Sequence, residues 1–529
     1  MAGEHRLDDF RRLTEQPRRA HRLRRTVRRS PTRDQEAFVT MKTRNDRCRP
    51  RRTGRLLALA LAAGALLWQP EPAAATPTGP EPAAVQAIAA RTVSTVDGGF
   101  GLAATDLSDR VADLTTSLPT QGVQNLLSQA DKSISSGTAC ATDPFGAGDG
   151  GIAPLAPAVK YCWSDDDALN HEWIPQGITG VSDAQADEYW GTKRPLIASW
   201  YDDSTACTPA GTPACADKGV RLSFLDPATG KYRHVLLAAP YYNSYGHISY
   251  RAVNIHAGGI AWYKYRLYVT DTLHGLRVFD LRDILDLDPD RNPSTNNSTP
   301  DGLTSNVQDN GKVGRQSNVW YSYGYRYVLP QVGSYDFVSA QYNSSAGTCE
   351  SSGAPKASYL SVDRSSSPPQ LIMGEYCTTD STHPDNGRIG ALPVDDTDGS
   401  LLATADGLVS AVATYALPVK QVQGDSRYAG RWYLNQSHRY SNASLWRAAV
   451  GGDGALAVTG GEIRTAVGAE DMYYEHGQAT GAAPLLWSQS EHRADINDPS
   501  CTATGPTPDP TPCGRVIYAH RVSDILTQP

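Results

Sequence analysis

The 529-residue sequence predicts an all-β protein, a β-propeller of five to seven blades with a partly helical or loosely ordered N-terminal extension. From residue 161 onward, short runs of β-branched and aromatic residues alternate with Gly, Pro, Asn and Asp, without a helical period. A three-strand unit recurs at least five times. Each unit is too small to bury both of its faces, so the units must stack around an axis. A β-sandwich or a β-helix fits less well, because the strands repeat in triplets and the spacings vary widely.

The N-terminal residues predict export by the Sec pathway. Within residues 41–75, an Arg-rich segment (44–55) precedes an apolar run (56–68), and Ala73-Ala74-Ala75 fits a cleavage site. The apolar run is shorter than the roughly 20 residues that a spanning helix needs, so no stable membrane span is expected after cleavage. The mature protein is therefore predicted to be secreted and extracellular.

The remaining boundaries follow from composition. Residues 1–40 form a basic leader or reflect a misassigned start codon. Residues 76–158 are an Ala/Pro/Gly-rich extension, in which residues 107–130 are modestly periodic and predict one or two short helices. Residues 159–529 are assigned to the propeller.

The mature protein is acidic, which limits its partners. Residues 1–75 hold 18 of the 49 Lys and Arg but only 8 of the 56 Asp and Glu, so their removal leaves a net charge of −17. Such a field repels nucleic acid and anionic membranes. We therefore expect an extracellular glycan, peptide or protein as partner, and a monomeric chain.

Eight of the nine cysteines remain after the leader is removed, an even number in an oxidising compartment. Four disulfides are expected. Sequence order suggests Cys140–Cys162, Cys207–Cys215, Cys349–Cys377 and Cys501–Cys513, among the 105 connectivities that eight cysteines allow. The absence of any C-x-x-C spacing argues against a zinc–thiolate cluster.

The strands of the repeated unit align along the chain. The second strands are predicted at residues 195–202, 266–271, 370–376, 431–438 and 484–492. The third strands follow at residues 220–226, 275–280, 387–392, 443–447 and 515–519. A further strand at residues 325–330 either belongs to the second unit or begins a sixth.

Several short motifs resemble the blades of uncharacterised secreted β-propeller proteins of actinomycetes. They are residues 174–178 (IPQGI), 256–261 (HAGGIA) with 267–271 (LYVTD), 276–280 (LRVFD), and Glu470-Asp471 before a strand. The similarity covers residues 170–529 and implies a propeller fold outside the cell. The motifs also resemble the dispase autolysis-inducing propeller protein of streptomycetes, which implies an extracellular interaction role.

Strand direction predicts where a site would lie. In a propeller blade the first strand leaves one face and the second returns to it, so the starts of first strands and the ends of second strands share one mouth. The candidates there are Gln176, Asp202, His256, Asp271, His274, Glu375, Tyr376, Gln423, His438, Glu470, Asp471, Glu491 and His492. Amides, carboxylates and aromatic rings of this kind suit a carbohydrate or another polar ligand. The alternative is that they only satisfy loop amides around a central channel.

No catalytic residue can be assigned, because the sequence has no G-x-S-x-G elbow, H-E-x-x-H helix, P-loop or dinucleotide fingerprint. Two enzymatic alternatives stay open at the same mouth. A glycoside hydrolase would pair carboxylates, Glu375 or Asp271 with Glu470 or Glu491. A polysaccharide lyase would pair His with Tyr, as in His256 or His438 with Tyr201 or Tyr376.

No motif requires a cofactor. A metal ion could bind through the mouth histidines His256, His274, His438 and His492. The segment from Asp286 to Asn292 resembles the start of a calcium loop but lacks its Gly and Glu, so it is predicted to be an exposed acidic turn.

Overall fold

The computed structural model describes residues 99–136, 140, 142–146, 151–204, 217–289, 297–298, 304–339, 347–350, 352–452, 454–493 and 513–529. All of them belong to the compact unit that begins at residue 90.

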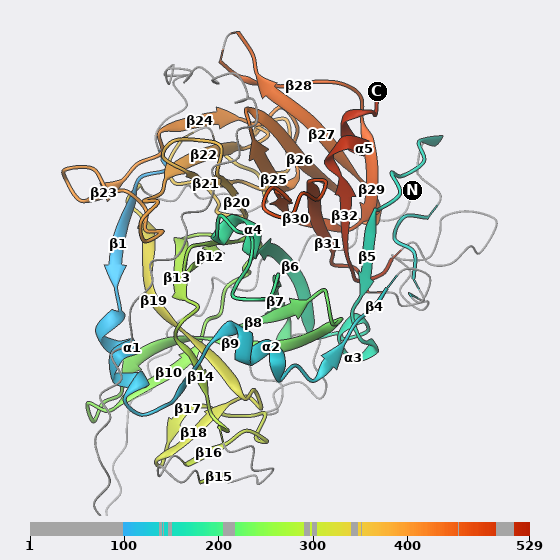
Figure 1. Ribbon diagram of the computed structural model, residues 1–529. Helices are drawn as coiled ribbons and strands as arrows, with labels where there is room; N and C mark the ends of the chain where they lie inside the picture. Colours follow the sequence, from blue (N-terminus) through green and yellow to red (C-terminus); the bar gives the residue numbers. More distant parts are fainter. Residues whose placement is uncertain are drawn as a thin grey trace, which may run out of the picture. The chain divides into compact units, whose positions relative to one another are not determined.

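The unit is a β-propeller of five blades (Figure 1). Blade I contains β6 (Trp173–Gly180), β7 (Leu196–Asp202), β8 (Val220–Asp226) and β9 (Lys231–Tyr242). Blade II contains β11 (Ile260–Tyr263), β12 (Arg266–Asp271), β13 (Gly275–Asp280) and β19 (Tyr327–Phe337). Blade III contains β20 (Tyr359–Asp363), β21 (Gln370–Gly374), β22 (Arg388–Pro393) and β24 (Ala413–Ala416).

Blade IV contains β25 (Val422–Tyr428), β26 (Arg431–His438) and β27 (Ser441–Val450), which pairs with β28 (Leu456–Val458) and β29 (Ile463–Val467). Blade V contains β30 (Ala469–Glu475), β31 (Leu485–Ser490) and β32 (Val516–Arg521) from the C-terminal part, then β5 (Val159–Cys162) and β4 (Ser135–Ser136) from the N-terminal part. The two ends of the propeller sequence thus close the ring within one sheet.

The predicted strand triplets are confirmed. The second strands are β7, β12, β21, β26 and β31, and the third strands are β8, β13, β22, β27 and β32. The strand predicted at residues 325–330 is the start of β19 and belongs to the second unit. Its first half also pairs in parallel with β9, which joins blades I and II into one sheet.

Each interface between neighbouring blades has its own hydrophobic cluster, consistent with five blades in a ring. The clusters are centred on buried side chains such as Trp262 between blades I and II, Leu360 between II and III, Trp432 between III and IV, Met472 between IV and V, and Trp200 between V and I. Because strand side chains alternate between faces, each blade can contribute to the clusters on both of its sides.

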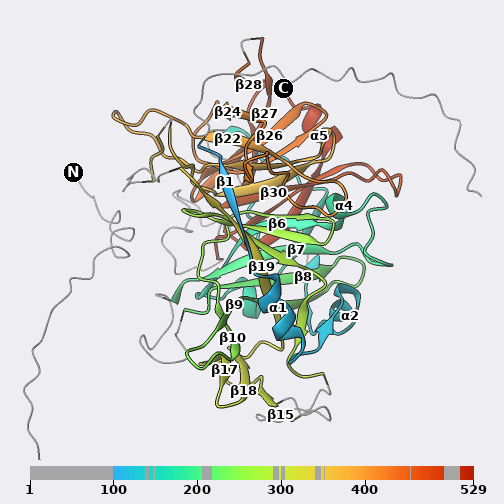
Figure 2. The same cartoon turned by 90° about the vertical axis from the view of Figure 1, so that its left-hand side faces the viewer.

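The N-terminal extension packs along the outer edge of the propeller (Figure 2). Strand β1 (Leu102–Asp106) pairs with β19 and β23 (Leu408–Val409), β2 (Thr120–Gln121) with β14 (Ile284–Asp286), β3 (Lys132–Ser133) with β9, and β4 with β5. One or two short helices were predicted within residues 107–130, and the structure has two, α1 (Ser108–Thr115) and α2 (Val123–Ser128). Both bury apolar residues spaced three or four apart against the outer strands.

The other elements are short. Strand β10 (Ile248–Ala252) pairs with β9, and a small sheet of β15 (Asn297–Ser298), β16 (Thr304–Asn306), β17 (Val313–Gln316) and β18 (Val319–Ser322) is inserted before β19. Helices α3 (Asp165–Ala168), α4 (Val181–Ala184) and α5 (Val522–Leu526) follow β5, β6 and β32. No helix among the residues described above is long and apolar enough to cross a membrane.

The five innermost strands, β6, β11, β20, β25 and β30, contact one another around the axis. Asp471 of β30 lies at their centre and is fully buried. Its carboxyl oxygens accept backbone N–H bonds from Ile178, Ile260 and Leu360, at 3.2, 3.1 and 3.4 Å, so that it links blade V to blades I, II and III. Gly424 completes the packing, because a Cβ there would lie 2.8 Å from the Cα of Asp471.

One turn differs from its prediction. The acidic segment that begins at Asp286 was predicted to be exposed, but Asp286 and Asp288 are both buried. Arg326 donates to both carboxylate oxygens of Asp286 at 2.7 Å, and this paired geometry compensates for the buried charge. Residues 290–292 lie outside the described residues.

Two of the four predicted disulfides are present, Cys140–Cys162 and Cys349–Cys377. The predicted Cys207–Cys215 bridge lies outside the described residues, as does Cys501 of the predicted Cys501–Cys513 bridge. Cys140–Cys162 joins the extension to β5, the strand that closes the ring.

We expect Asp471→Ala to lower the free energy of unfolding by about 3 kcal/mol or more, because several buried N–H groups would lose their acceptor at a cost of roughly 1–3 kcal/mol each. Asp471→Asn keeps one carbonyl oxygen that can accept, so it should lose less. Urea unfolding followed by tryptophan fluorescence measures both variants. An alanine variant as stable as the wild type would contradict the linking role of Asp471.

We expect the double variant Cys140→Ser/Cys162→Ser to lose about 3 kcal/mol of stability, because the bridge spans 22 residues and constrains the unfolded chain. The same urea titration, run without reductant, measures the loss. If the double variant and the wild type have the same midpoint urea concentration of unfolding, the bridge does not stabilise the closed ring.

Candidate functional site

Three innermost strands contain a β-bulge at the same end of the axis, the end at which these strands begin. The register shifts between Pro175 and Ile178 in β6, between Val422 and Gly424 in β25, and between Ala469 and Met472 in β30. A bulge changes the direction of a side chain relative to regular alternation. The bulged segments carry Gln176, Gln423 and Glu470, so that three separate blades supply polar groups to this end, which we call the mouth.

A chain of hydrogen bonds connects these groups across the mouth. Gln176 Nε2 donates to Glu491 Oε2 at 2.9 Å, and Gln423 Nε2 donates to Glu470 Oε1 at 3.2 Å. The carboxyl groups of Glu470 and Glu491 also lie close to each other, and their interaction adds to the effect of burial, which raises the pKa of Glu470. Gln176 and Glu470 are each only 1% exposed, whereas the Glu491 side chain is 22% exposed.

The environment of Glu470 favours its protonated form. Burial raises the pKa of Glu470 well above its usual range, and the neighbouring carboxyl groups of Glu491 and Asp471 add to this shift. Burial likewise raises the pKa of Asp471, although the backbone N–H bonds from Ile260 and Ile178 oppose the change. Both shifts favour the protonated carboxyl group over the carboxylate.

Aromatic and imidazole rings surround this chain. Tyr201 stacks on the exposed ring of His256 with centroids 4.6 Å apart, and Tyr440 stacks on His492 at 4.4 Å. Tyr376 accepts a hydrogen bond from Gln421 at 3.2 Å. Burial and the carboxyl groups of Glu491, Asp203 and Glu470 raise the pKa of Tyr201, so this phenol is neutral at physiological pH.

Of the predicted candidates, the structure brings together Gln176, His256, Tyr376, Gln423, Glu470, Glu491 and His492. His492 Nδ1 lies 3.7 Å from Glu491 Oε1. Burial raises the pKa of Tyr376, and the carboxyl groups of Glu470 and Glu491 act in the same direction.

Six candidates lie apart from this group and have partners of their own. Asp471 lies below the mouth on the axis. Asp202 accepts from the backbone N–H of Lys218 at 2.6 Å, and burial together with Glu172 raises the pKa of Asp202 to about 7. The others are bound to neighbouring side chains: Asp271 to His274 and Arg277, Glu375 to Arg388, and His438 to Ser444. His274, the remaining candidate, belongs to the Asp271 group.

The four histidines considered as metal ligands do not gather within the part of the chain that the structure describes. The one suitable grouping there, Cys349, Glu375 and Cys377, is not a metal site, because the two thiols form a disulfide and Glu375 pairs with Arg388.

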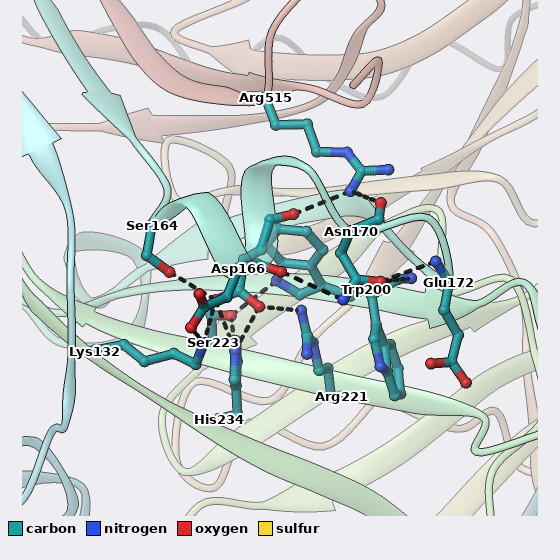
Figure 3. A network of polar contacts seen from close by, with 12 residues as sticks. Lys132, Ser164, Asp166, Asn170, Glu172, Trp200, Arg221, Ser223, His234 and Arg515 are labelled. Carbon is teal, nitrogen blue, oxygen red and sulfur yellow. Dashed lines mark hydrogen bonds and ion pairs between the residues drawn. The ribbon is translucent and has the colours of Figure 1, made fainter. Parts of the chain in front are cut away.

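A second polar network is buried where the extension, blade I and blade V meet (Figure 3). Asp167 of α3 accepts from Arg221 at 2.7 Å and from Tyr232 at 2.5 Å, and it pairs with Lys132 of β3 at 3.1 Å. Burial alone would raise the pKa of Asp167, but Arg221 and His234 outweigh it and hold the pKa well below its usual range. The network ties three separate segments at the ring closure.

Within this network, Asp167, His234 and Ser223 follow the carboxylate–imidazole–hydroxyl order of a hydrolase triad. His234 Nε2 lies 3.1 Å from Asp167 Oδ2, and His234 Nδ1 lies 2.9 Å from Ser223 Oγ. Ser223 is fully buried, however, and Trp200 Nε1 donates to its hydroxyl oxygen at 2.8 Å. No substrate can reach this serine, so the network is structural.

Sequence reasoning did not find Arg515, which connects the network to the mouth. Its Nε donates to the backbone oxygen of Glu491 at 2.8 Å, and its Nη1 donates to the backbone oxygens of Asp167 and Asn170. Gln421 and Tyr440 were also missed. The repeated Gln-Gly pair at 176–177 and 423–424 was a usable signal for the bulges, but nothing in the pattern around Arg515 indicated its role.

A cavity of about 570 Å³ lies elsewhere, between α1, β1 and the outer part of blade II. Its lining includes Asp280 and Arg282, which pair with each other at 2.6 Å. It shares no lining residue with the mouth.

No protein-family model and no curated protein matches the chain. Similar solved structures include a GH43 β-xylosidase/α-arabinofuranosidase from a compost microbial metagenome, at 10% identity and a TM-score of 0.27, covering 67% of this chain and 92% of that one. A thermostable family-43 glycoside hydrolase has 8% identity and a TM-score of 0.27, covering 67% and 91%. The six-bladed propeller lectin of Aleuria aurantia has 9% identity and a TM-score of 0.24, covering 62% and 74%. Scores this low carry no functional argument, and the propeller assignment rests on the strand pairing.

The buried network predicts a pH dependence. Burial, aided by Arg221, lowers the pKa of His234 to about 4, whereas an unfolded histidine has a pKa of about 6.5. Between these values the unfolded chain binds more protons, so the free energy of unfolding must fall as pH decreases from about 6.5 to 4. His234→Gln cannot titrate. The stability advantage of the wild type over this variant should therefore shrink by up to about 3 kcal/mol across that range.

Urea titrations at pH 7, 5.5 and 4 measure this difference. His247→Gln, which changes an exposed histidine on the turn after β9, is the control and should follow the wild type. A constant difference between wild type and His234→Gln at all three pH values would contradict the buried, neutral state of His234.

Proposed function

We propose that the protein is a secreted β-propeller that binds an extracellular glycan at the mouth. The observation that carries the proposal is that three bulged side chains from blades I, IV and V lie at one end of the axis together with Glu491 and the surrounding rings. Amide and carboxyl groups can bind sugar hydroxyls, and the faces of aromatic rings can pack against sugar CH groups. The two disulfides and the leader sequence support an extracellular location.

The arrangement of the carboxyl groups favours binding over glycoside hydrolysis. Two-carboxylate glycosidases hold these groups roughly 5 Å or more apart, which leaves space for the scissile bond. Glu470 is buried, and the nearby carboxyl group of Glu491 adds to the rise in its pKa, so the two groups form one coupled pair instead. The other carboxylates considered for this chemistry, Glu375 and Asp271, are paired with Arg388 and Arg277.

A polysaccharide lyase is the second candidate, supported by the stacked pair of Tyr201 and His256 at the mouth. Such a reaction needs one group that abstracts a proton and another that returns it. Incubation with polysaccharides, followed by measurement of newly formed unsaturated sugar ends, distinguishes this function from binding alone.

We expect the exposed rings to contribute to glycan binding. His256→Ala and Tyr440→Ala should each weaken binding by about tenfold, because a ring–sugar contact is worth roughly 1 kcal/mol or more. Their unfolding temperatures should remain near that of the wild type. A glycan array identifies the ligand and isothermal titration calorimetry measures its affinity.

Tyr245→Ala is the matched control, because Tyr245 is 83% exposed on the turn after β9 at the outer edge of blade I. It should bind like the wild type. The proposed site would be refuted if all three variants lost the same affinity for the glycan, or if neither mouth variant changed that affinity. It would also be refuted if no glycan on the array bound. A bound peptide or protein would change the ligand class while keeping the mouth as the site.

A further inference from the structure

Three arginines lie along the side of the mouth that blades IV and V form. Arg439 belongs to the turn between β26 and β27, Arg493 follows β31, and Arg515 precedes β32. Arg515 Nε donates to the backbone oxygen of Glu491 at 2.8 Å. Burial lowers the pKa of Arg515 to about 9, and the nearby charge of Arg493 acts in the same direction. Positively charged groups therefore gather at one edge of the mouth, although the mature chain as a whole is acidic.

The backbone of Arg439 is fixed at the mouth. Its carbonyl oxygen accepts a hydrogen bond from His492 Nε2 at 3.0 Å, and its N–H donates to Ser437 Oγ at 3.2 Å. The ring of the next residue, Tyr440, stacks on His492 with centroids 4.4 Å apart. The other ring nitrogen of His492, Nδ1, lies 3.7 Å from Glu491 Oε1. A single imidazole ring therefore separates the backbone of Arg439 from the carboxyl group of Glu491.

The side chain of Arg439 is exposed and has no hydrogen bond or ion pair within the part of the chain that the structure describes. The exposed Arg282, by contrast, pairs with Asp280 at 2.6 Å. Burial raises the pKa of Tyr376, and the charge of Arg439 opposes this rise, which places the guanidinium near the phenol. A guanidinium has five N–H donors and no acceptor. Arg439 therefore offers free donors to a ligand at the mouth.

The two glutamates of the mouth do not neutralise Arg439. Burial raises the pKa of Glu470, so its uncharged form is favoured. Glu491 accepts from Gln176 at 2.9 Å, and its charge acts on Arg515. At about 0.1 M salt, charges farther away than about 10 Å are largely screened, so these local groups decide which ligands bind. The positive charge of Arg439 is thus available to a negatively charged group of a ligand.

We propose that the mouth binds an acidic glycan, in which the carboxylate of a uronic acid pairs with Arg439. The planar guanidinium can donate two parallel N–H bonds to the two oxygens of a carboxylate, whereas a sugar hydroxyl offers it a single oxygen. Tyr440, which belongs to the same turn and is 43% exposed, supplies a ring against which the sugar can pack. The inference rests on the proposed glycan-binding function and names the class of glycan.

Calorimetry tests this inference with three acidic tetrasaccharides: one of galacturonate, one of mannuronate, and one of glucuronate alternating with N-acetylglucosamine. The methyl ester of each is its matched control, because it keeps the sugar rings and removes the charge. Each probe is titrated into the mature protein at about 0.1 M salt. We expect at least one acid to bind, at least about tenfold more tightly than its own ester, as charge-assisted hydrogen bonds predict. Added salt should weaken binding of the acid more than binding of the ester.

Arg439→Gln removes the charge and should bind the acid and its ester equally tightly. Arg431→Gln is the matched control, because Arg431 is an exposed arginine at the opposite end of β26, away from the mouth, and this variant should keep the preference for the acid. Thermal unfolding checks that both variants fold, which we expect because both side chains are exposed. Equal binding of acid and ester by the wild type, or a preference for the acid that persists in Arg439→Gln, would overturn the inference.

The proposed function can survive that result. If the esters or a neutral glycan of the array bind as tightly as the acids, and His256→Ala weakens this binding, the mouth binds glycans without selecting a carboxylate. The inference then fails alone. If no probe and no glycan on the array binds, the proposed function fails together with it.

Discussion

The carboxyl group of Asp471 provides hydrogen-bond acceptors for backbone N–H groups that the propeller fold buries at its axis. The innermost strand of every blade has one edge without a neighbouring strand, so its N–H groups point toward the axis without a sheet partner. Buried backbone N–H groups must find an acceptor. Asp471 accepts from equivalent positions of β6, β11 and β20, namely Ile178, Ile260 and Leu360. The blades can therefore approach closely at the axis, where Gly259 and Gly424 leave room for the neighbouring backbone.

The same constraint produces the candidate site. In a regular strand, Glu470 and Asp471 would point to opposite faces, because adjacent side chains alternate. The bulge in β30 lets Asp471 reach the axis while Glu470 faces the mouth. The bulges in β6 and β25 contain different residues from the bulge in β30. Gln176 and Gln423 supply the side chains at the mouth, and each is followed by a glycine at a position where a Cβ would clash with a neighbouring strand. Architecture and site thus depend on the same three irregularities.

The fold was largely predictable because strand alternation and turn residues are local signals. The number of blades was less predictable from the sequence, because β19 pairs with β13 of blade II and also with β9 of blade I. One strand therefore belongs to the sheets of two blades. For the mouth, strand direction indicated which end each residue occupies but not its distance from the axis. The ends of second strands lie one strand farther out, so Asp202, Asp271 and His438 have local partners. Glu491 reaches back because Gln176 binds it, a contact between residues 315 positions apart.

Ring closure and the geometry of the mouth are mechanically coupled through Arg515. This side chain holds the backbone of Glu491 and, through its Nη1 group, the backbone of α3, which follows the N-terminal strand of blade V. Asp167 of α3 is in turn fixed by Arg221 of blade I and Lys132 of the extension. A separation of blades I and V would break these contacts and move Glu491 away from Gln176. The buried polar network therefore stabilises the position of a binding group as well as the closed ring, which explains why so many charged side chains are buried at this junction.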